Sequence, residues 1–295
     1  MNISIKRIIS SFLFALARRI ERGSAGLDEK SMQVDHHKIV YLEGGKGETV
    51  LLLHGFGGDK DNWTRFSKYL TKKYHVISLD LPGFGESSKI WSDTYDITTQ
   101  IKRVHQYTEK MGLKKLHIAG NSMGGLIAGI FAATYPDEVL SLGLLDPIGV
   151  IAREPSQLSL EVEKGNNPLI VESVSDYNKL LGFLFVKPPY IPGPVKSYLT
   201  EMAIQSREFN KKVFIEANPG NQLEAVAWEI RVKTLILWGD TDRVVPSSSA
   251  AVLQKVIENS KAILMKDCGH VPMLERPKET AQYYLDFISL NKINY

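Results

Sequence analysis

The stretch from Leu116 to Ile130 constrains the fold of this chain more than any other. An apolar, β-prone run ends at Gly120, and a helical pattern of small and aliphatic residues begins after Ser122. Ser122 lies between Gly120 and Gly124 with the G-x-S-x-G spacing of a sharp strand–turn–helix junction. A side chain at either glycine position would collide with the adjacent strand or helix. The pattern therefore predicts a strained turn that holds Ser122 above a sheet, beside the positive end of a helix.

Bulk properties are those of a globular protein. The chain has 295 residues, of which 43% are hydrophobic and 23% charged, enough to bury a sizeable core. A single cysteine, Cys268, excludes an internal disulfide framework. The formal net charge of +3 is concentrated in residues 1–22, which carry five basic side chains and one acidic side chain. Because the remainder is close to neutral and holds no nucleic-acid-binding motif, we exclude nucleic acid as a partner.

Residues 1–22 are an apolar and basic segment that allows several interpretations. The apolar run is about half of the roughly 20 residues that a transmembrane helix needs. A signal peptide would fit Lys6 and Arg7 before a short apolar core and the cleavage-like Ala15-Leu16-Ala17. An interfacial helix would fit apolar residues at helical spacing, with most basic residues on the other face: Ile5, Ile9, Phe12, Leu16 and Ile20. A helix docked on its own domain is the remaining interpretation. We expect membrane association through this segment, with export through a signal peptide as the alternative.

Strands and helices alternate along most of the remaining chain. Residues 23–36 are polar and contain glycine, so we expect a linker there. Residues 37–147 alternate between apolar strands and amphipathic helices, and Thr49–Leu53 is continuously apolar, which is typical of a strand buried on both faces of a parallel sheet. Residues 148–230 interrupt this pattern with helix-prone, proline-punctuated sequence, and we expect an inserted cap over the carboxyl ends of the strands. Alternation resumes over residues 231–295, which predicts an α/β layered sheet.

Residues with catalytic chemistry follow four of the predicted strands. Phe56 lies in the loop after Thr49–Leu53, Ser122 follows its own strand, and Asp242 and His270 follow the last two strands. Open α/β sheets bind ligands at the carboxyl ends of their strands. The chain order Ser, Asp, His is that of one class of serine hydrolases on such sheets. We predict Ser122 as nucleophile, His270 as general base and Asp242 as the acid that orients His270.

Two backbone N–H groups are predicted to complete the site. The amide of Met123 directly follows the nucleophile, and the amide of Phe56 lies in the loop after the first buried strand. Amides at these two positions form the oxyanion hole in hydrolases of this kind.

Residues 35–290 resemble the α/β-hydrolase fold, and the motifs that carry the resemblance follow the strand ends: His54-Gly55-Phe56-Gly57, Asp80 to Ser87, Gly120 to Gly125, Gly239 to Asp242, and Gly269-His270. More narrowly, the chain is similar to bacterial lipases of the Moraxella and Psychrobacter type (lipase family V), including Asn166–Leu169 and Lys187–Pro192 in the cap. Mammalian monoacylglycerol lipases share the core motifs. The resemblance implies an α/β-hydrolase fold with a mostly parallel eight-stranded sheet, flanking helices and a helical cap. It also implies lipase or esterase activity on acylglycerols or similar apolar esters.

Several residues keep a second interpretation. Asp146 ends another strand, where some relatives place the acid, and Asp240 lies two residues before Asp242. His54 is interpreted as a brace of its loop, and Cys268 as a small buried residue. No metal-ligand spacing and no dinucleotide-binding glycine motif is present, so we expect no cofactor and no metal.

Two other functions remain compatible with the motifs. Carbon–carbon bond hydrolases of the meta-cleavage product type also carry Gly-Asn-Ser-Met-Gly-Gly, and a non-turnover receptor could retain the triad. Dehalogenases and most epoxide hydrolases need an aspartate nucleophile, and position 122 is serine.

Overall fold

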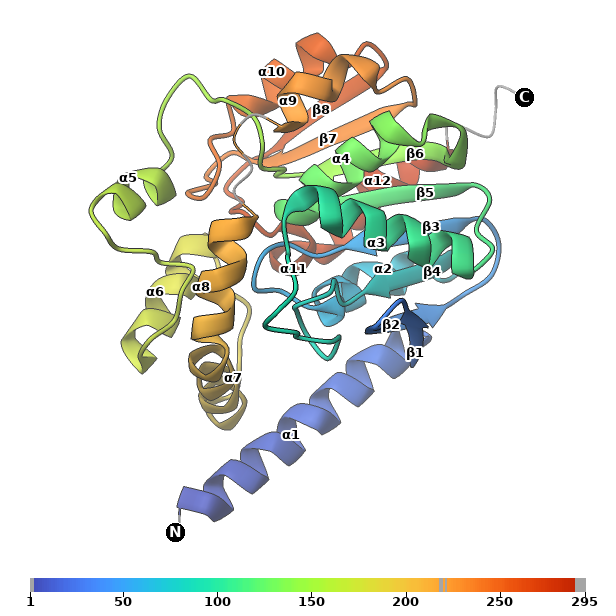
Figure 1. Ribbon diagram of the computed structural model, residues 1–295. Coiled ribbons are helices and arrows are strands. Elements are labelled where there is room, and N and C mark those ends of the chain that lie inside the picture. Colours follow the sequence, from blue (N-terminus) through green and yellow to red (C-terminus); the bar gives the residue numbers. More distant parts are fainter. Residues whose placement is uncertain (1–2, 218–219, 221, 290–295) are drawn as a thin grey trace.

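The computed structural model describes residues 3–217, 220 and 222–289. Its centre is an eight-stranded sheet in the order β1-β2-β4-β3-β5-β6-β7-β8. β2 is antiparallel to both β1 and β4, and the other neighbouring strands are parallel. This confirms the predicted fold class (Figure 1). The strands are β1 (Leu27–Val34), β2 (His37–Gly44), β3 (Thr49–Leu53), β4 (His75–Leu79), β5 (Leu116–Asn121), β6 (Val139–Leu145), β7 (Thr234–Gly239) and β8 (Ser260–Met265).

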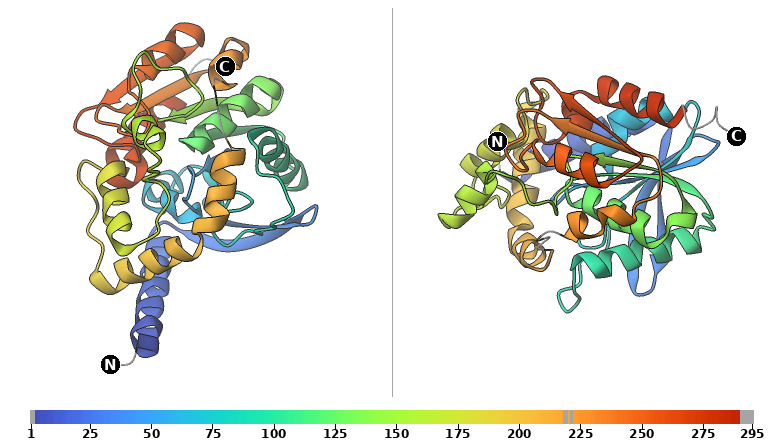
Figure 2. Two further views of the ribbon diagram at one scale, coloured as in Figure 1. Left: turned by 60° about the vertical axis from the view of Figure 1, so that its left-hand side comes forward. Right: turned by 90° about the horizontal axis from the view of Figure 1, so that it is seen from above.

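Helices cover both faces of the sheet, as the right-hand view of Figure 2 shows. Alternate residues of β3 point to opposite faces, so Leu51 and Leu53 belong to one core cluster and Val50 and Leu52 to the other. This strand is therefore buried on both faces, as its apolar sequence predicts. One face carries α3 (Ile97–Lys110), α4 (Met123–Thr134) and α10 (Ser249–Val256), and the other carries α2 (Thr64–Leu70), α11 (Pro272–Glu275) and α12 (Pro277–Ser289).

The expected linker over residues 23–36 is wrong. Helix α1 (Ile3–Ser24) reaches into this range, and the whole of β1 lies within it. β1 is the edge strand, paired with β2 from Leu27 opposite Gly44 to Val34 opposite His37. Most of its side chains between these ends are exposed and polar, so the sequence lacks the apolar run of a buried strand.

The described residues between β6 and β7 form five α-helices and a short 3₁₀ helix (Ala227–Glu229). The α-helices are α5 (Gln157–Glu163), α6 (Val174–Leu184), α7 (Gly193–Gln205), α8 (Arg207–Glu216) and α9 (Gln222–Val226). Helices α5 to α8 form a group beside one end of the sheet (Figure 1). The amide of His270 donates to the carbonyl of Leu184 (2.9 Å), and the rings of Phe56 and Phe214 lie 5.5 Å apart. These contacts place the group over the loops that follow β3 and β8. Helix α9 packs instead on α4 of the core, where Leu223 is fully buried.

Helix α1 packs against α7 (Figure 2, left). It also exposes apolar side chains on its other side. Its docked side places the ring of Phe14 5.1 Å from that of Tyr198 on α7. Its outward side, here called the apolar face, exposes Ile8, Ile9, Phe12, Leu13, Leu16 and Ile20, while the side chain of Ile5 lies outside the described residues. No helix in the described part of the chain is both long and apolar enough to span a membrane.

Candidate active site

Ser122 lies on the strained turn that its flanking glycines predict. Its backbone has φ 56° and ψ −119°, a conformation that non-glycine residues rarely adopt, and it directly precedes α4. A Cβ at Gly120 would lie 2.0 Å from the carbonyl oxygen of Gly124, and one at Gly124 would lie 2.3 Å from that of Leu53. Both glycines are therefore required by close backbone contacts, and the turn places Ser122 at the N-terminal end of a helix.

The predicted base and acid form a buried pair. Nδ1 of His270 lies 2.7 Å from Oδ2 of Asp242, and their side chains are 4% and 0% exposed. Oδ1 of Asp242 accepts hydrogen bonds from the amides of Val244 (2.7 Å) and Val245 (3.1 Å). Three donors thus surround one carboxylate, and the bond between Asp242 and His270 places a proton on Nδ1 of His270. That tautomer leaves Nε2 of His270 as the proton acceptor.

The loop after β3 packs directly on the nucleophile turn. A Cβ at Gly55 would lie 3.0 Å from Cβ of Ser122, so the chain approaches Ser122 closely at this point. The next residue is Phe56, whose ring lies between Phe84 of the core (5.8 Å) and Phe214 of the cap helix α8 (5.5 Å). The structure therefore brings the loop of Phe56 and the amide of Met123, at the start of α4, to the same turn.

Sequence analysis does not identify two residues that position the loop of His270. The side chain of Asn121 donates to the carbonyls of His270 (2.9 Å) and Leu145 (3.2 Å) and so ties the nucleophile strand to the loop of the base. Glu275 accepts from the amides of Gly269 (3.0 Å) and Lys187 (2.7 Å), which joins the base loop to the cap. The contacts from Asn121 to His270 and from Lys187 to Glu275 join groups remote in sequence, so no local pattern could indicate them.

Comparisons with known proteins agree with this geometry. The model of the alpha/beta hydrolase fold family matches residues 48–277. The chain belongs to the α/β-hydrolase fold family. Lipase 1 of Psychrobacter immobilis is 39% identical to it, over 92% of this chain and 87% of the relative. Human monoacylglycerol lipase ABHD6 is 31% identical, over 98% and 92%.

Solved structures of the same family superpose closely on the chain. A membrane phospholipase A described as a bacterial virulence factor has a TM-score of 0.94 at 47% identity, covering 97% of this chain and 93% of its own. A putative lipase of Acinetobacter baumannii has a TM-score of 0.89 at 31% identity, covering 96% and 97%. A 2-hydroxy-6-oxo-6-phenylhexa-2,4-dienoate hydrolase of Rhodococcus, covering 89% of this chain and 99% of its own, is 23% identical with a TM-score of 0.77 and shares the fold alone.

His54 braces the loop of Phe56, as expected. It is fully buried; its Nε2 accepts from the amide of Leu81 (3.0 Å), and its Nδ1 lies 2.7 Å from the carbonyl of Gly55. The first bond requires an unprotonated Nε2. Burial lowers the pKa of His54 to about 4, so the ring is neutral at pH 7.

We expect this neutral ring to make stability depend on pH. Between pH 6.5 and pH 4 the unfolded chain protonates His54 and the folded chain does not, so the free energy of unfolding falls as the pH drops. The loss contributed by His54 should approach about 3 kcal/mol. His54→Gln keeps an acceptor for the amide of Leu81 but cannot titrate. Urea unfolding from pH 4 to pH 8 should show a flatter acid limb for this variant, and parallel curves would contradict the assignment.

Two groups of side chains in the described part of the chain have metal-ligand geometry. One contains Asp242 and His270 and belongs to the candidate site. The other is His36, His37 and Asp93, in which both rings place Nε2 2.6 Å from the same oxygen of Asp93. The guanidinium of Arg103 lies 3.3 Å from that oxygen, and this positive charge opposes a cation there. We interpret the second group as a hydrogen-bonded ion pair.

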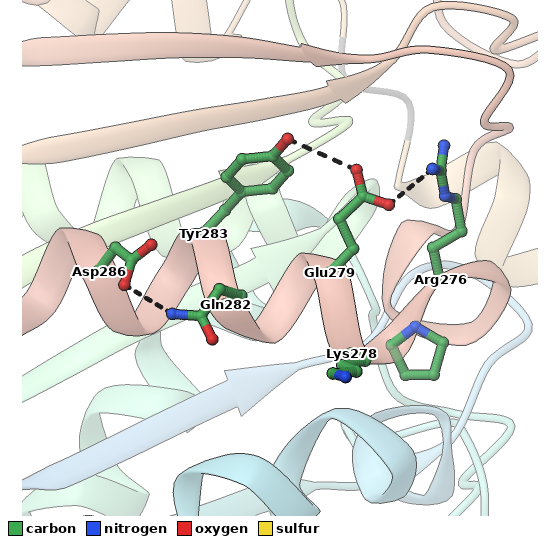
Figure 3. Close-up of a pocket in the computed structure, with 7 residues that line it drawn as sticks. Arg276, Lys278, Glu279, Gln282, Tyr283 and Asp286 are labelled. Carbon is green, nitrogen blue, oxygen red and sulfur yellow. Dashed lines mark hydrogen bonds and ion pairs between the residues drawn. The ribbon is translucent and has the colours of Figure 1, made fainter.

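A surface pocket lies along α12 (Figure 3). Its polar groups pair with one another: Glu279 with Arg276 at 2.7 Å, and Gln282 with Asp286 at 2.7 Å. None of the predicted site residues lines it, so we assign it no part in the chemistry. The pocket is lined by Arg276, Pro277, Lys278, Glu279, Gln282, Tyr283 and Asp286.

Proposed function

We propose that this protein is a serine hydrolase that cleaves carboxylic esters of lipids, such as acylglycerols, through an acyl-enzyme on Ser122. Oγ of Ser122 attacks the ester carbonyl carbon while Nε2 of His270 takes the hydroxyl proton. The amides of Phe56 and Met123 stabilise the oxyanion. His270 then gives the proton to the leaving alcohol, and water, activated by the same ring, releases the fatty acid and regenerates Ser122.

The buried pair of His270 and Asp242 is the observation that carries this proposal. A hydroxyl is a poor nucleophile at neutral pH, and it needs a neutral imidazole held in the correct tautomer. The 2.7 Å contact supplies that tautomer. The bond from Asn121 to the carbonyl of His270 ties this pair to the turn of Ser122.

The lipid substrate class is supported by the relatives. Lipases, a monoacylglycerol lipase and a membrane phospholipase A match over most of this chain. The substrates that these names imply share one reactive group, a fatty acyl ester of a glycerol backbone. Partly buried apolar side chains at the end of α6, Leu181, Phe183 and Leu184, lie beside the loop of His270 and offer surface for an acyl chain.

Active-site labelling tests the nucleophile. The wild-type protein should react with a fluorophosphonate probe, and Ser122→Ala should not. An intact wild-type protein that resists the probe, or a Ser122→Ala variant that still labels, would contradict the proposal.

A series of substrates from short p-nitrophenyl esters to emulsified mono- and triacylglycerols and phospholipid vesicles then defines the substrate. Activity confined to short soluble esters would reduce the assignment from lipase to esterase, and turnover of a vinylogous diketo acid instead would favour a carbon–carbon bond hydrolase.

We also propose that the apolar face of α1 attaches the protein to a lipid surface. Ile8, Phe12 and Ile20 are 64%, 65% and 62% exposed on one side of the helix, and an exposed apolar stripe favours burial at the headgroup boundary. The triple substitution of these residues by serine should abolish sedimentation with phospholipid vesicles and leave hydrolysis of a soluble ester unchanged. Equal sedimentation of both proteins would contradict the attachment. A cellular protein that begins at Arg18 would favour export instead.

A further inference from the structure

A second carboxyl group lies beside the proposed acid–base pair and has no part in the mechanism above. Asp146 follows β6, the strand between β5, which leads to Ser122, and β7, which leads to Asp242. It has no exposed surface. Carboxylate oxygens of Asp146 and Asp242 and a ring nitrogen of His270 all lie within 4.8 Å of one another.

The backbone around Asp146 is fixed on both sides. Its φ of 46° lies in the left-handed region, one of four such non-glycine residues in the described chain, together with Ser122. The amide of Ser122 donates to the carbonyl of Leu145 (3.0 Å), and the amide of Ile148 donates to that of Ser122 (3.3 Å). The segment that carries Asp146 is therefore held against the nucleophile turn.

The hydrogen bonds of the two carboxyl groups are unequal. Asp242 accepts from two backbone amides and from His270. Asp146 accepts one bond, from the amide of Gly239 to Oδ1 (2.8 Å), and no donor among the described residues reaches its buried Oδ2. Two carboxylates this close in a buried site cannot both be ionised. Asp242 accepts more hydrogen bonds and therefore keeps the negative charge, and the proton resides on Asp146.

The surrounding charges support the same state. Burial and the charge of Asp242 raise the pKa of Asp146 well above its usual value, and the carboxylate of Glu275 acts in the same direction. Cys268, the other titratable group nearby, is buried, and burial raises the pKa of its thiol. The remaining neighbour is His270, which the mechanism requires as a neutral ring.

We propose that Asp146 is a neutral positioning residue that supports Asp242 through its O–H group, and that it becomes the partner of His270 when Asp242 loses its charge. The inference rests on the proposed function, because it assumes that His270 is the base for Ser122. In Asp242→Asn the opposing charge is gone, so Asp146 can ionise within 4.8 Å of the ring nitrogen and orient it in place of Asp242.

Four proteins test this inference: the wild type, Asp146→Asn, Asp242→Asn and the double variant. Asparagine at position 146 retains an acceptor for Gly239 and a donor toward Asp242, so kcat/KM of a soluble ester should stay within about threefold of wild type. Asp242→Asn should lose less than the roughly 10⁴-fold that removal of the acid costs in a triad without a substitute. Its residual activity should rise with pH as Asp146 ionises. The double variant should lose at least a further tenfold and this pH dependence.

The readouts separate the possible failures. Equal activity of Asp242→Asn and the double variant would overturn the reserve role. The infrared C=O band of a protonated carboxyl should be present in the wild type and absent from Asp146→Asn; an unchanged spectrum would overturn the neutral state. Asp240→Asn is the control, since Asp240 is exposed and bonds to the hydroxyl of Thr241. Failure of the proposed function itself would appear separately, as a wild-type protein that neither labels with a fluorophosphonate nor hydrolyses esters.

Discussion

Ser122→Ala and His270→Ala are each expected to lower kcat by about 10⁵- to 10⁶-fold, and the double variant should be no slower than either alone. The reason is that the two side chains perform one step. Without the hydroxyl of Ser122 the imidazole of His270 has no proton to take, and without the imidazole the hydroxyl stays a poor nucleophile. Stopped assays on a short soluble ester measure both effects, and KM should change little because neither group binds the substrate in its ground state.

A second buried histidine offers a matched control for this experiment. His54 is as buried as His270 and lies in the same region of the molecule, but its Nε2 accepts the amide of Leu81. His54→Gln should lower stability, and its loss of kcat should be far smaller than that of His270→Ala because His54 contacts no reacting group. If the fold-losses of kcat in Ser122→Ala and His270→Ala multiplied in the double variant, the two residues would act independently. That result would contradict the triad.

The parts of the fold that the sequence predicted are those with a strong local pattern. β3 is buried on both faces, so the four residues Val50–Leu53 are all apolar. The turn of Ser122 is tight enough to exclude a side chain at Gly120 and Gly124, which leaves a visible spacing. β1 has no such pattern, because this edge strand presents polar side chains to water. Its sequence therefore resembles that of a loop.

The candidate site shows the same division. The strand-end positions of Ser122, Asp242 and His270 follow from the chain order, but the choice between Asp242 and Asp146 does not. Both follow neighbouring strands of the sheet, and only the 2.7 Å contact pairs Asp242 with His270. Asn121 and Glu275 contact the backbone of His270 and Lys187, which are far away in sequence, and such contacts depend on the completed fold.

The basic residues of α1 are a further case. Their spacing suggested a polar face directed to water or to lipid headgroups, whereas Arg18 and Arg22 turn inward and are each 17% exposed. Arg22 forms a bidentate (two-pronged) ion pair with Asp61, with hydrogen bonds of 2.6 and 2.7 Å, and Arg18 forms an ion pair with Asp59. Much of the positive charge of this segment is therefore neutralised by the protein itself.

These two arginines hold the chain that directly follows the loop of Phe56. Asp59 begins a 3₁₀ turn over Lys60–Trp63, which it caps through the amide of Asp61 (3.0 Å). Lys60 is fully buried between Asp80 (2.9 Å) and Glu86. Glu29, the fifth carboxylate of this cluster, contacts Arg22 at 2.8 Å. Without the arginines, only Lys60 and Lys89 among the described residues would be left to balance these five carboxylates.

We therefore expect Arg18→Gln/Arg22→Gln to weaken both the fold and the reaction. Breaking ion pairs that are largely buried should cost about 3 kcal/mol of unfolding free energy. Displacement of Asp59 would move the loop of Phe56, three residues earlier, and a shift of about 1 Å in a catalytic group can cost up to about 100-fold in rate. Because the oxyanion exists only in the transition state, kcat should fall by about 10- to 100-fold with KM nearly unchanged.

Two variants on the same helix separate docking from lipid attachment. Arg7→Gln removes one positive charge from the same helix, but its contact with Glu201 is 3.5 Å long and about half exposed, so it should cost less than about 1 kcal/mol and leave kcat intact. Arg22→Lys keeps the charge and loses the two-pronged geometry, so its kcat should fall between the two. The assay uses a soluble ester without vesicles, in which the apolar face plays no part. A double arginine variant with wild-type kcat there would show that α1 serves attachment alone, whereas the predicted loss would mean that the docking of α1 also maintains the oxyanion hole.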